Sequence, residues 1–300
     1  MMDDFVDKVD IMMIGHFAKD RIVVDGRGED VPGGAVYYGS IALRRLGLEV
    51  AVVTRLHPDD FPLLEELKKA GVHVIANPAP ETSGIENIYS SDDMEHRITH
   101  PLGFAGPFTP EDVPYIHAKI YAVVPIMAGE VNLSLLERIA SWGPTALDVQ
   151  GFIRVREGNA LVFKPWPEMA DGLKVVTYLK ADMAEASALT GMDEPLAAAR
   201  ALSTYGPTEV VLTRSEGVLV YADRHGYFAP FTPRSLAGRT GRGDTCFATY
   251  LGKRLSLPPD EACRWAAAVT TLKQEKPGPW DGDMKALGQI LQRTPVTYLK

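Results

Sequence analysis

The chain has 300 residues, a formal net charge of −8 at pH 7, and apolar and charged fractions of 46% and 23%. These values are typical of a globular protein with a sizeable core, arranged as one large α/β domain or two smaller ones. Because Lys and Arg are not in excess, the charge argues against an unaided nucleic-acid-binding protein, although a nucleotide needs only a few local donors.

Short apolar runs alternate with longer amphipathic stretches along most of the chain. The apolar runs predict buried strands at residues 9–15, 50–54, 120–124, 145–149, 175–179 and 210–213. The amphipathic stretches predict helices at residues 35–46, 59–70 and 261–273, and a further helix from the glycine-rich stretch near residue 241 to residue 255. This alternation is typical of a largely parallel sheet with helices on both faces.

Two polar, turn-rich segments interrupt the alternation. Residues 21–31 and 85–99 have β-like rather than helical character. They predict a small sheet that projects from the main domain as a lid, although ordinary surface hairpins would have the same composition. We therefore expect a single domain over residues 1–300, with lid segments near 21–31 and 85–99.

The cysteines and the N-terminal region indicate a reduced, cytoplasmic protein. Cys246 and Cys263 fall within predicted helices and lack metal-binding spacing, so we expect two buried thiols rather than a disulfide. The N-terminal region is acidic and has only a short apolar run, unlike a secretory signal. The sequence has no apolar stretch long enough to span a membrane, so we expect no membrane partner.

The glycine-rich stretch at residues 237–247 is the most informative motif. Gly241 and Gly243 flank Arg242 directly before an apolar helical run, so backbone N–H groups and the helix dipole there can hold an anion. Asp244 falls in the first turn, where a carboxylate can accept the proton of a substrate hydroxyl that attacks a phosphoryl group. An ordinary helix start has the same residues, because Asp is favoured there and glycines form turns.

Two motifs at opposite ends of the chain resemble the ribokinase-like (PfkB) carbohydrate kinase family. The first is the glycine pair Gly33-Gly34, followed by a predicted helix that ends in Leu-Gly at residues 46–47. The second is the segment 241–244, which resembles the family's Gly-Ala-Gly-Asp motif. The resemblance covers nearly the whole chain and implies a Rossmann-like three-layer α/β/α sandwich with a small β-sheet lid. It also implies that Asp244 is the catalytic base and that Gly241, Arg242 and Gly243 form its anion hole.

Further segments resemble the donor and metal sites of the family. Asp182 and Glu185 match its Asn-x-x-Glu segment, which organises water around Mg²⁺, with Asp in place of Asn; two solvent-facing acids in a first helical turn are the alternative interpretation. The turn at residues 213–217 resembles a nucleotide-binding turn, with Ser where Gly is usual. The resemblance implies ATP and Mg²⁺ as cofactors. The donor-binding residues that it implies are Thr213, Ser215, Gly217, Lys180 and Thr240.

The acceptor site is also implied by the resemblance. The substrate-binding residues would be Asp20, Gly33, Gly34, Tyr38, Asp148 and Gln150. A carboxylate such as Asp20 suits a polyol because it accepts two hydroxyl hydrogen bonds. Tyr38 stands where many sugar kinases have Asn, so the substrate is expected to differ from free ribose. The stretch 147–155 particularly resembles myo-inositol kinases of this family, which makes a cyclitol the leading acceptor and leaves other sugars and nucleosides open.

Two departures from the family pattern change the expectations. Gly238 stands where ribokinase-type members have an Asp that helps to bind a monovalent cation, so we do not expect strong activation by K⁺. Arg242 replaces a small residue within the anion hole, where its side chain either contacts phosphate or points to solvent.

These features together predict an ATP-dependent phosphotransferase that acts on a hydroxyl of a small polyol. One alternative is a non-catalytic nucleotide- or metabolite-binding relative, because Gly238, Ser215, Asp182 and Tyr38 depart from the family pattern. Another is a nucleoside kinase of the same fold. A dehydrogenase is disfavoured because no Gly-x-Gly-x-x-Gly follows the first strand. Lid-mediated dimers are common among relatives, so the resemblance leaves a homodimer open.

Overall fold

The computed structural model describes residues 7–90 and 93–300, with only the backbone described for residues 93–97. Ten strands form one central sheet: β1 (Lys8–Ile14), β4 (Val50–Leu56), β5 (His73–Pro78), β8 (His117–Val123), β9 (Thr145–Asp148), β12 (Tyr178–Asp182), β13 (Glu209–Thr213), β14 (Gly217–Ala222), β15 (His225–Pro230) and β16 (Thr297–Leu299). They are hydrogen-bonded in the order β16-β15-β14-β13-β12-β9-β8-β1-β4-β5.

Most of this sheet is parallel, as predicted. Every neighbouring pair from β13 through β12, β9, β8, β1 and β4 to β5 is parallel. The remaining strands, β14, β15 and β16, are antiparallel and form one edge of the sheet. The prediction did not include this edge. Short turns between β13, β14 and β15 leave no room for a crossover helix, so these strands must pair as hairpins.

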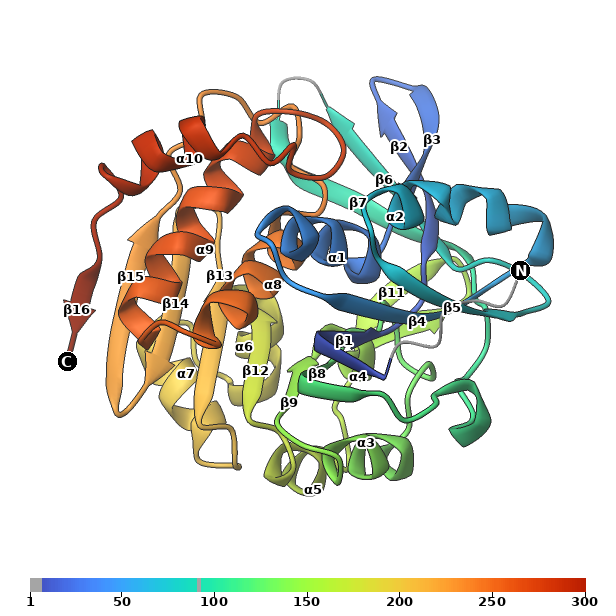
Figure 1. Cartoon of the computed structure of the whole chain (residues 1–300), viewed down its shortest axis with the longest axis horizontal. Helices are drawn as coiled ribbons and strands as arrows, with labels where there is room; N and C mark the ends of the chain where they lie inside the picture. The colour runs from blue at the N-terminus through green and yellow to red at the C-terminus, as the bar shows by residue number, and fades with distance from the viewer. Residues whose placement is uncertain (1–6, 91–92) are drawn as a thin grey trace.

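Helices cover both faces of the sheet (Figure 1). One core layer contains α1 (Ala35–Arg45), α2 (Glu65–Lys69), α8 (Arg242–Arg254) and α9 (Pro259–Gln274), and α10 (Met284–Leu291) packs outside α9. The other layer contains α3 (Leu133–Ala140), α5 (Met169–Lys174), α6 (Met183–Thr190) and α7 (Pro195–Ser203). Strand β1 supplies Ile11 and Met13 to the first layer and Met12 and Ile14 to the second, because side chains alternate along a strand. This confirms the three-layer α/β/α architecture.

Two predicted elements differ from the structure. The segment 59–70 is a 3₁₀-helix, η1 (Pro58–Leu64), followed by the short α2, because Pro62 lacks the N–H that an α-helix would use there. The strand expected at 175–179 begins at Tyr178 instead, since Val175 is the C-terminal cap of α5. The apolar run continues from the helix end into the strand, so hydrophobicity alone does not locate the boundary.

The two polar segments form a separate small sheet, as predicted for a β-sheet lid. Its strands are β2 (Ala18–Val24), β3 (Arg27–Gly33), β6 (Gly84–Ser90) and β7 (Asp93–Gly103), in the order β3-β2-β6-β7. Figure 1 shows this sheet projecting from the main domain beside α1 and α2. A hairpin of β10 (Arg154–Glu157) and β11 (Ala160–Phe163), the turn α4 (Gln150–Ile153) and the 3₁₀ turn η2 (Pro110–Asp112) complete the described elements.

Both cysteines lie in helices, as predicted. Cys246 in α8 and Cys263 in α9 are fully buried and carry free thiols. Within residues 7–90 and 93–300, none of the helices combines the length and the apolar character needed to cross a lipid bilayer.

Candidate active site

A cavity of about 150 Å³ lies where the carboxyl ends of the parallel strands face the lid sheet. Open α/β folds bind their ligands at this edge. This volume suits a small molecule. The cavity is lined by Asp20, Gly34, Ala35, Tyr38, Ile85, Asn87, Val124, Pro125, Ile126, Gln150, Arg154, Lys180, Asp182, Thr213, Arg239, Thr240, Gly241, Arg242, Gly243 and Asp244.

The start of α8 forms one wall of this cavity. Gly241 is the N-terminal cap of the helix and has a left-handed backbone conformation with φ of 81°, which glycine adopts without strain. Gly243 lies within the first turn, where a Cβ atom would stand 3.8 Å from both Nζ of Lys180 and Oγ1 of Thr213. The first backbone N–H groups of a helix have no intrahelical partner, so this end of α8 can bind an anion.

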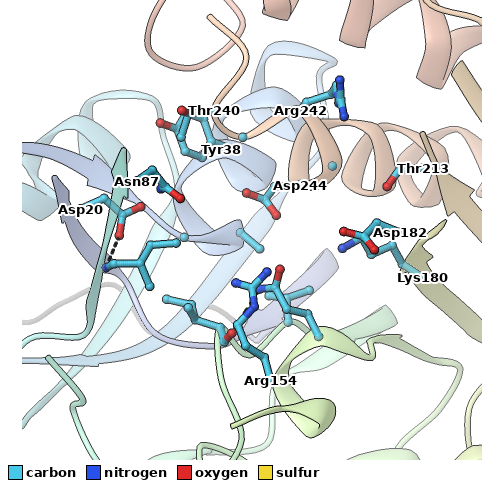
Figure 2. A pocket seen from close by; sticks show the side chains of 18 of the residues that line it. Asp20, Tyr38, Asn87, Arg154, Lys180, Asp182, Thr213, Thr240, Arg242 and Asp244 are labelled. Atoms are coloured by element: carbon cyan, nitrogen blue, oxygen red, sulfur yellow. Dashed lines mark hydrogen bonds between the residues drawn. The ribbon is translucent and has the colours of Figure 1, made fainter. Parts of the chain in front are cut away.

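Asp244 occupies the middle of the cavity, in the first turn of α8. Figure 2 shows its carboxylate between two groups of side chains, with Arg154 below it. One group, on the side of the lid, contains Asp20, Tyr38, Asn87 and Thr240; the other, on the side of the main sheet, contains Lys180, Asp182 and Thr213. A carboxylate in this position can therefore face a ligand bound at either end of the cavity.

The lid end of the cavity offers polar groups at fixed positions. Asp20 on β2 is almost buried, and its Oδ1 accepts a hydrogen bond from the backbone N–H of Ile85 on β6 at 2.9 Å. Gly33 makes room for this carboxylate, because a Cβ atom at Gly33 would lie 2.0 Å from Oδ2 of Asp20. Gln150 also lines the cavity, and its Nε2 donates a hydrogen bond to the carbonyl oxygen of Ile126 at 3.2 Å.

Tyr38 presents its ring, rather than its hydroxyl, to the start of α8. The hydroxyl of this buried residue donates to the carbonyl oxygen of Pro32 at 3.4 Å. A Cβ atom at Gly241 would lie 2.3 Å from the first ring carbon of Tyr38, so the ring lies directly against the Gly241 backbone. The phenol side chain therefore supports the helix start.

At the other end of the cavity, Lys180 is buried on β12 among carboxylates. Its Nζ lies 3.0 Å from Oδ2 of Asp148 and 3.6 Å from Oε2 of Glu185. Burial opposes its charge, but the carboxylates of Asp148, Glu185, Asp182 and Asp244 together raise the pKa of Lys180 well above its ordinary value. Lys180 therefore stays positively charged and faces the anion-binding turn of α8.

Asp182 and Glu185 form a capping box at the start of α6. The N–H of Asp182 donates to Oε2 of Glu185 at 2.7 Å, and the N–H of Glu185 donates to Oδ1 of Asp182 at 2.8 Å. Burial raises the pKa of Glu185, while Lys180 opposes this shift. Oε1 of Glu185 is buried without a hydrogen-bond partner, and Asp182 lines the cavity. These carboxylates fit a Mg²⁺ ion held mainly by water and donor phosphates, which is the usual coordination of this ion.

The structure brings together most of the residues that the resemblance implied. Those that line the cavity are Asp20, Gly34, Tyr38, Gln150, Lys180, Asp182, Thr213, Thr240, Gly241, Arg242, Gly243 and Asp244. Gly33, Asp148 and Glu185 stand behind this wall and contact its residues. Ser215, in the turn between β13 and β14, and Gly217, the first residue of β14, lie away from the cavity lining, and Oγ of Ser215 donates to Oε2 of Glu216 at 2.9 Å.

Sequence reasoning missed several lining residues. Asn87 comes from β6 of the lid, and its Oδ1 accepts a hydrogen bond from the hydroxyl of Thr99 at 3.1 Å. A polar residue within a polar lid segment gives no signal that it faces a cavity. Arg154 and Arg239 also line the cavity. Arg154 lies within the stretch 147–155 and Arg239 within the stretch 237–247, so a positive charge inside each motif was the signal that could have identified them.

A buried polar pair lies beneath the point where the lid leaves the main sheet. Nδ1 of His16, just after β1, is 2.7 Å from Oγ of Ser83 and 3.4 Å from Oε2 of Glu130. Oε1 of Glu130 accepts backbone N–H hydrogen bonds from Ile126 and Met127 at 2.7 and 3.0 Å. Burial raises the pKa of Glu130 to about 8, although these N–H groups oppose it. Burial and the nearby Arg55 lower the pKa of His16 to about 3.

These shifts make the pair a source of pH-dependent stability. Between about pH 3 and 8 the folded pair holds one proton. With the ordinary pKa values of 4.5 for Glu130 and 6.5 for His16, the unfolded pair holds two protons below pH 4.5, one proton between pH 4.5 and 6.5, and none above pH 6.5. Stability therefore rises with pH below 4.5, where the unfolded pair binds more protons, and falls above 6.5, where the folded pair binds more. A neutral pair and a His⁺–Glu⁻ pair hold the same number of protons, so the direction does not depend on the proton's position.

The fold and this site define a class of protein. A largely parallel sheet with a β-sheet lid, and a carboxylate in the first turn of a helix that begins at a glycine, is the arrangement of a ribokinase-type small-molecule kinase. The sequence matches the family described as pfkB family carbohydrate kinase over residues 2–285. The chain therefore belongs to this family and is a phosphotransferase.

Two solved structures and one further relative are similar over almost their full length. A pyrophosphate-dependent kinase in the ribokinase family, solved as a sulfate complex, is 34% identical, with a TM-score of 0.87 and coverage of 93% of this chain and 99% of that chain. A pyrophosphate-dependent kinase of that family, complexed with a pyrophosphate analog and myo-inositol, is 33% identical, with a TM-score of 0.86 and the same coverage. The cytidine kinase of Thermococcus kodakarensis is 28% identical over 292 residues, which cover 91% of this chain and 98% of the relative.

Proposed function

We propose that this kinase phosphorylates a hydroxyl of a small polyol, with a cyclitol such as myo-inositol as the leading acceptor. The observation that carries the proposal is the position of Asp244, between the polar lid end of the cavity and the anion-binding start of α8. Asp20 and Asn87 supply oxygen and amide groups suited to several hydroxyls. Among the described residues that line the cavity, Tyr38 is the one aromatic, and its ring lies against Gly241 rather than open to a nucleobase.

In the proposed reaction an acceptor hydroxyl binds between Asp20 and Asp244. Its proton passes to the Asp244 carboxylate as its oxygen forms a bond to the terminal phosphorus of the donor. The bond between that phosphorus and the bridging oxygen breaks, and the rest of the donor leaves with the bonding electron pair. The backbone N–H groups of the turn from Gly241 to Gly243 stabilise charge on the transferring phosphoryl group.

Mg²⁺ is the proposed metal cofactor, and Asp182 and Glu185 are the residues that would hold it through water. When bound, the ion would neutralise charge on the donor phosphates. Lys180 also faces this region and contributes a fixed positive charge from the protein itself.

For the donor, we propose pyrophosphate, with ATP, which the sequence predicted, as the alternative. Lys180 and Arg242 line the cavity beside and at the start of α8, and they can compensate the charge of a small, highly charged anion. Arg239 also lines the cavity, with its guanidinium carbon 5.9 Å from the ring centroid of Tyr89 in the lid. The residues of the nucleotide-like turn other than Thr213 do not line the cavity, and Arg214 and Ser215 there both bond to Glu216. The two similar solved kinases are described as pyrophosphate-dependent.

A donor and acceptor screen tests this function. The purified protein would be incubated with Mg²⁺ and either pyrophosphate or ATP, together with cyclitols, sugars or nucleosides, and products identified by mass spectrometry. We expect a cyclitol monophosphate that forms faster with pyrophosphate than with ATP. Phosphorylation of cytidine alone would favour a nucleoside kinase instead, in line with the relative from Thermococcus kodakarensis. The absence of any phosphorylated polyol with either donor would reject the proposal.

Asp244→Asn tests the role of the base. We expect turnover to fall by roughly 10²–10⁴-fold, the usual contribution of a general base, because the amide cannot accept the hydroxyl proton. Thermal stabilisation by pyrophosphate should persist, since the α8 backbone is unchanged. Asp171→Asn is the matched control, because this exposed Asp forms an ion pair with Lys174 on α5 and does not line the cavity. Turnover of Asp244→Asn equal to that of the control would contradict the mechanism.

A further inference from the structure

Lys273, in the last turn of α9, is a buried cation next to the candidate active site. Its side chain is 1% exposed, and its Nζ donates a hydrogen bond to the carbonyl oxygen of Gly238 at 2.6 Å. Lysine is rarely buried, because a charge removed from water must be compensated by nearby groups. The surroundings of this ammonium group therefore indicate what it stabilises.

Gly238 belongs to the loop that leads into α8, and it contacts α9 very closely. Its N–H donates to the carbonyl oxygen of Gln274 at 2.8 Å, while its own carbonyl accepts from Lys273. A Cβ atom at Gly238 would lie 1.7 Å from the carbonyl oxygen of Lys276, so only glycine fits. The loop is thus attached to α9 by both backbone groups of one residue, three positions before the helix cap Gly241.

The same ammonium group also supports the helix cap through an aromatic ring. Nζ of Lys273 lies 5.1 Å from the ring centroid of Tyr38, within the range of a cation–π interaction. The ring lies directly against the backbone of Gly241, because a Cβ atom added at Gly241 would lie only 2.3 Å from a ring carbon of Tyr38. One buried cation therefore contacts both the loop before Gly241 and the ring that covers it.

We propose that Lys273 is a positioning residue of the phosphoryl-transfer site, whose ammonium group fixes Gly238 and Tyr38 and so holds the N–H groups from Gly241 to Gly243 toward the donor. This inference rests on the proposed role of that turn as the anion site, and it adds a residue that does not line the cavity. A shift of about 1 Å in such a turn can lower a rate by about 100-fold.

The charges around Lys273 favour its protonated form at neutral pH. Burial lowers the pKa of Lys273 to about 8, and the carboxylate of Asp244 on α8 opposes this shift. The other groups that face it are the phenol of Tyr38 on α1 and the carbonyl of Gly238. An anion bound at the start of α8 would add negative charge nearby and favour the ammonium form further.

The main experiment compares Lys273→Met with Lys273→Arg. Lys253→Met is the matched control, because Lys253 also stacks on a ring, with its Nζ 3.8 Å from the Trp265 centroid, but does not line the cavity. We expect Lys273→Met to lower kcat by about 10- to 100-fold with acceptor KM changed by less than about threefold, because the base and the acceptor contacts remain. Lys273→Arg should retain more activity than Lys273→Met, because arginine keeps a positive charge at this position.

Binding of sulfate, measured by calorimetry, separates this inference from the proposed function because it needs no acceptor and no turnover. Sulfate affinity should fall in Lys273→Met and stay unchanged in Lys253→Met. In the wild type near pH 8, sulfate binding should take up more protons than in Lys273→Arg, since arginine does not titrate there. This second comparison remains valid if Lys273→Met does not fold. Wild-type sulfate affinity in a folded Lys273→Met, or equal proton uptake by the wild type and Lys273→Arg, would overturn the inference.

Discussion

Two glycines in the start of α8 should respond in opposite ways to the same substitution. Gly241 has φ of 81°, and an added Cβ atom would lie 2.3 Å from a ring carbon of Tyr38. Gly243 has helical backbone geometry, and an added Cβ atom would meet its nearest neighbours, Lys180 and Thr213, only at 3.7 to 3.8 Å. Gly241→Ala therefore strains the folded protein, whereas Gly243→Ala fits it and fills only the space that a phosphoryl group needs.

The magnitudes follow from these contacts. For Gly241→Ala, the left-handed backbone costs about 1–2 kcal/mol and the overlap with Tyr38 about 1–3 kcal/mol, so stability should fall by about 2–5 kcal/mol. For a protein of this size, that loss lowers the melting temperature by roughly 3 to 8 °C. Gly243→Ala should leave stability unchanged or raise it by up to about 1 kcal/mol, because alanine favours a helix.

Thermal unfolding and turnover, measured on both variants, check the reasoning. Gly243→Ala should lose about 10²-fold in turnover, the effect of disturbing one hydrogen-bond donor to a developing charge, and should also lose pyrophosphate affinity. Gly288→Ala on α10 is the control for helix propensity, since a Cβ atom there meets nothing within 4 Å. A Gly241→Ala variant as stable as the wild type, or a fully active Gly243→Ala variant, would refute the assigned geometry.

Two further predictions concern the acceptor end and the pH dependence of stability. Asp20→Asn should raise acceptor KM by about tenfold or more, with a smaller effect on donor KM, because the carboxylate is proposed to bind only the hydroxyls of the acceptor. Steady-state kinetics would measure both KM values, and an unchanged acceptor KM would exclude the assignment. Above pH 6.5 the unfolding free energy from urea titration should fall by up to about 1.4 kcal/mol per pH unit through the His16–Glu130 pair. Glu130→Gln should remove this slope, whatever its effect on stability at pH 6, and an unchanged slope would assign it to other groups.

The strands and the helix start that frame Asp244 could be predicted because their signals are local. Strand β1 contains the apolar run from Ile11 to Ile14, which contributes side chains to both core layers, and such runs are typical of strands in parallel sheets. The start of α8 combines glycines with an acidic residue before an apolar helix, so the position of the helix start follows from a few neighbouring residues. Neither inference needs knowledge of distant contacts.

The burial of Lys180 and Lys273 could not be predicted in this way. Lys180 lies within a strand and Lys273 in the last turn of a helix, and in both places the residue type indicates exposure. Their burial depends on partners that are far away in the sequence, such as Asp148 for Lys180 and Gly238 for Lys273. Only the assembled sheet and helices bring these partners together.

Gly33 illustrates a different limit of sequence reasoning. The resemblance implies that this glycine binds substrate, which stays a prediction, and the structure adds that Gly33 lies beside Asp20, whose carboxylate occupies the space that a side chain at Gly33 would need. A sequence motif records that glycine is present but not which atom approaches it. The close approach belongs to the pairing of β2 with β3, where Ala18 is the partner of Gly33 in register.

The same distinction separates the transfer chemistry, which a short motif could predict, from the identity of the phosphate donor, which stays a proposal. Charge on a transferring phosphoryl group is stabilised by backbone N–H groups, whose direction depends on the glycine positions and the helix start and therefore on a short motif. The proposed donor site instead combines side chains that reach the same cavity from separate elements, here Lys180 from β12 and Arg242 from the start of α8. We therefore expect changes at those two positions to alter which phosphate donor is accepted while the position of Asp244 is kept.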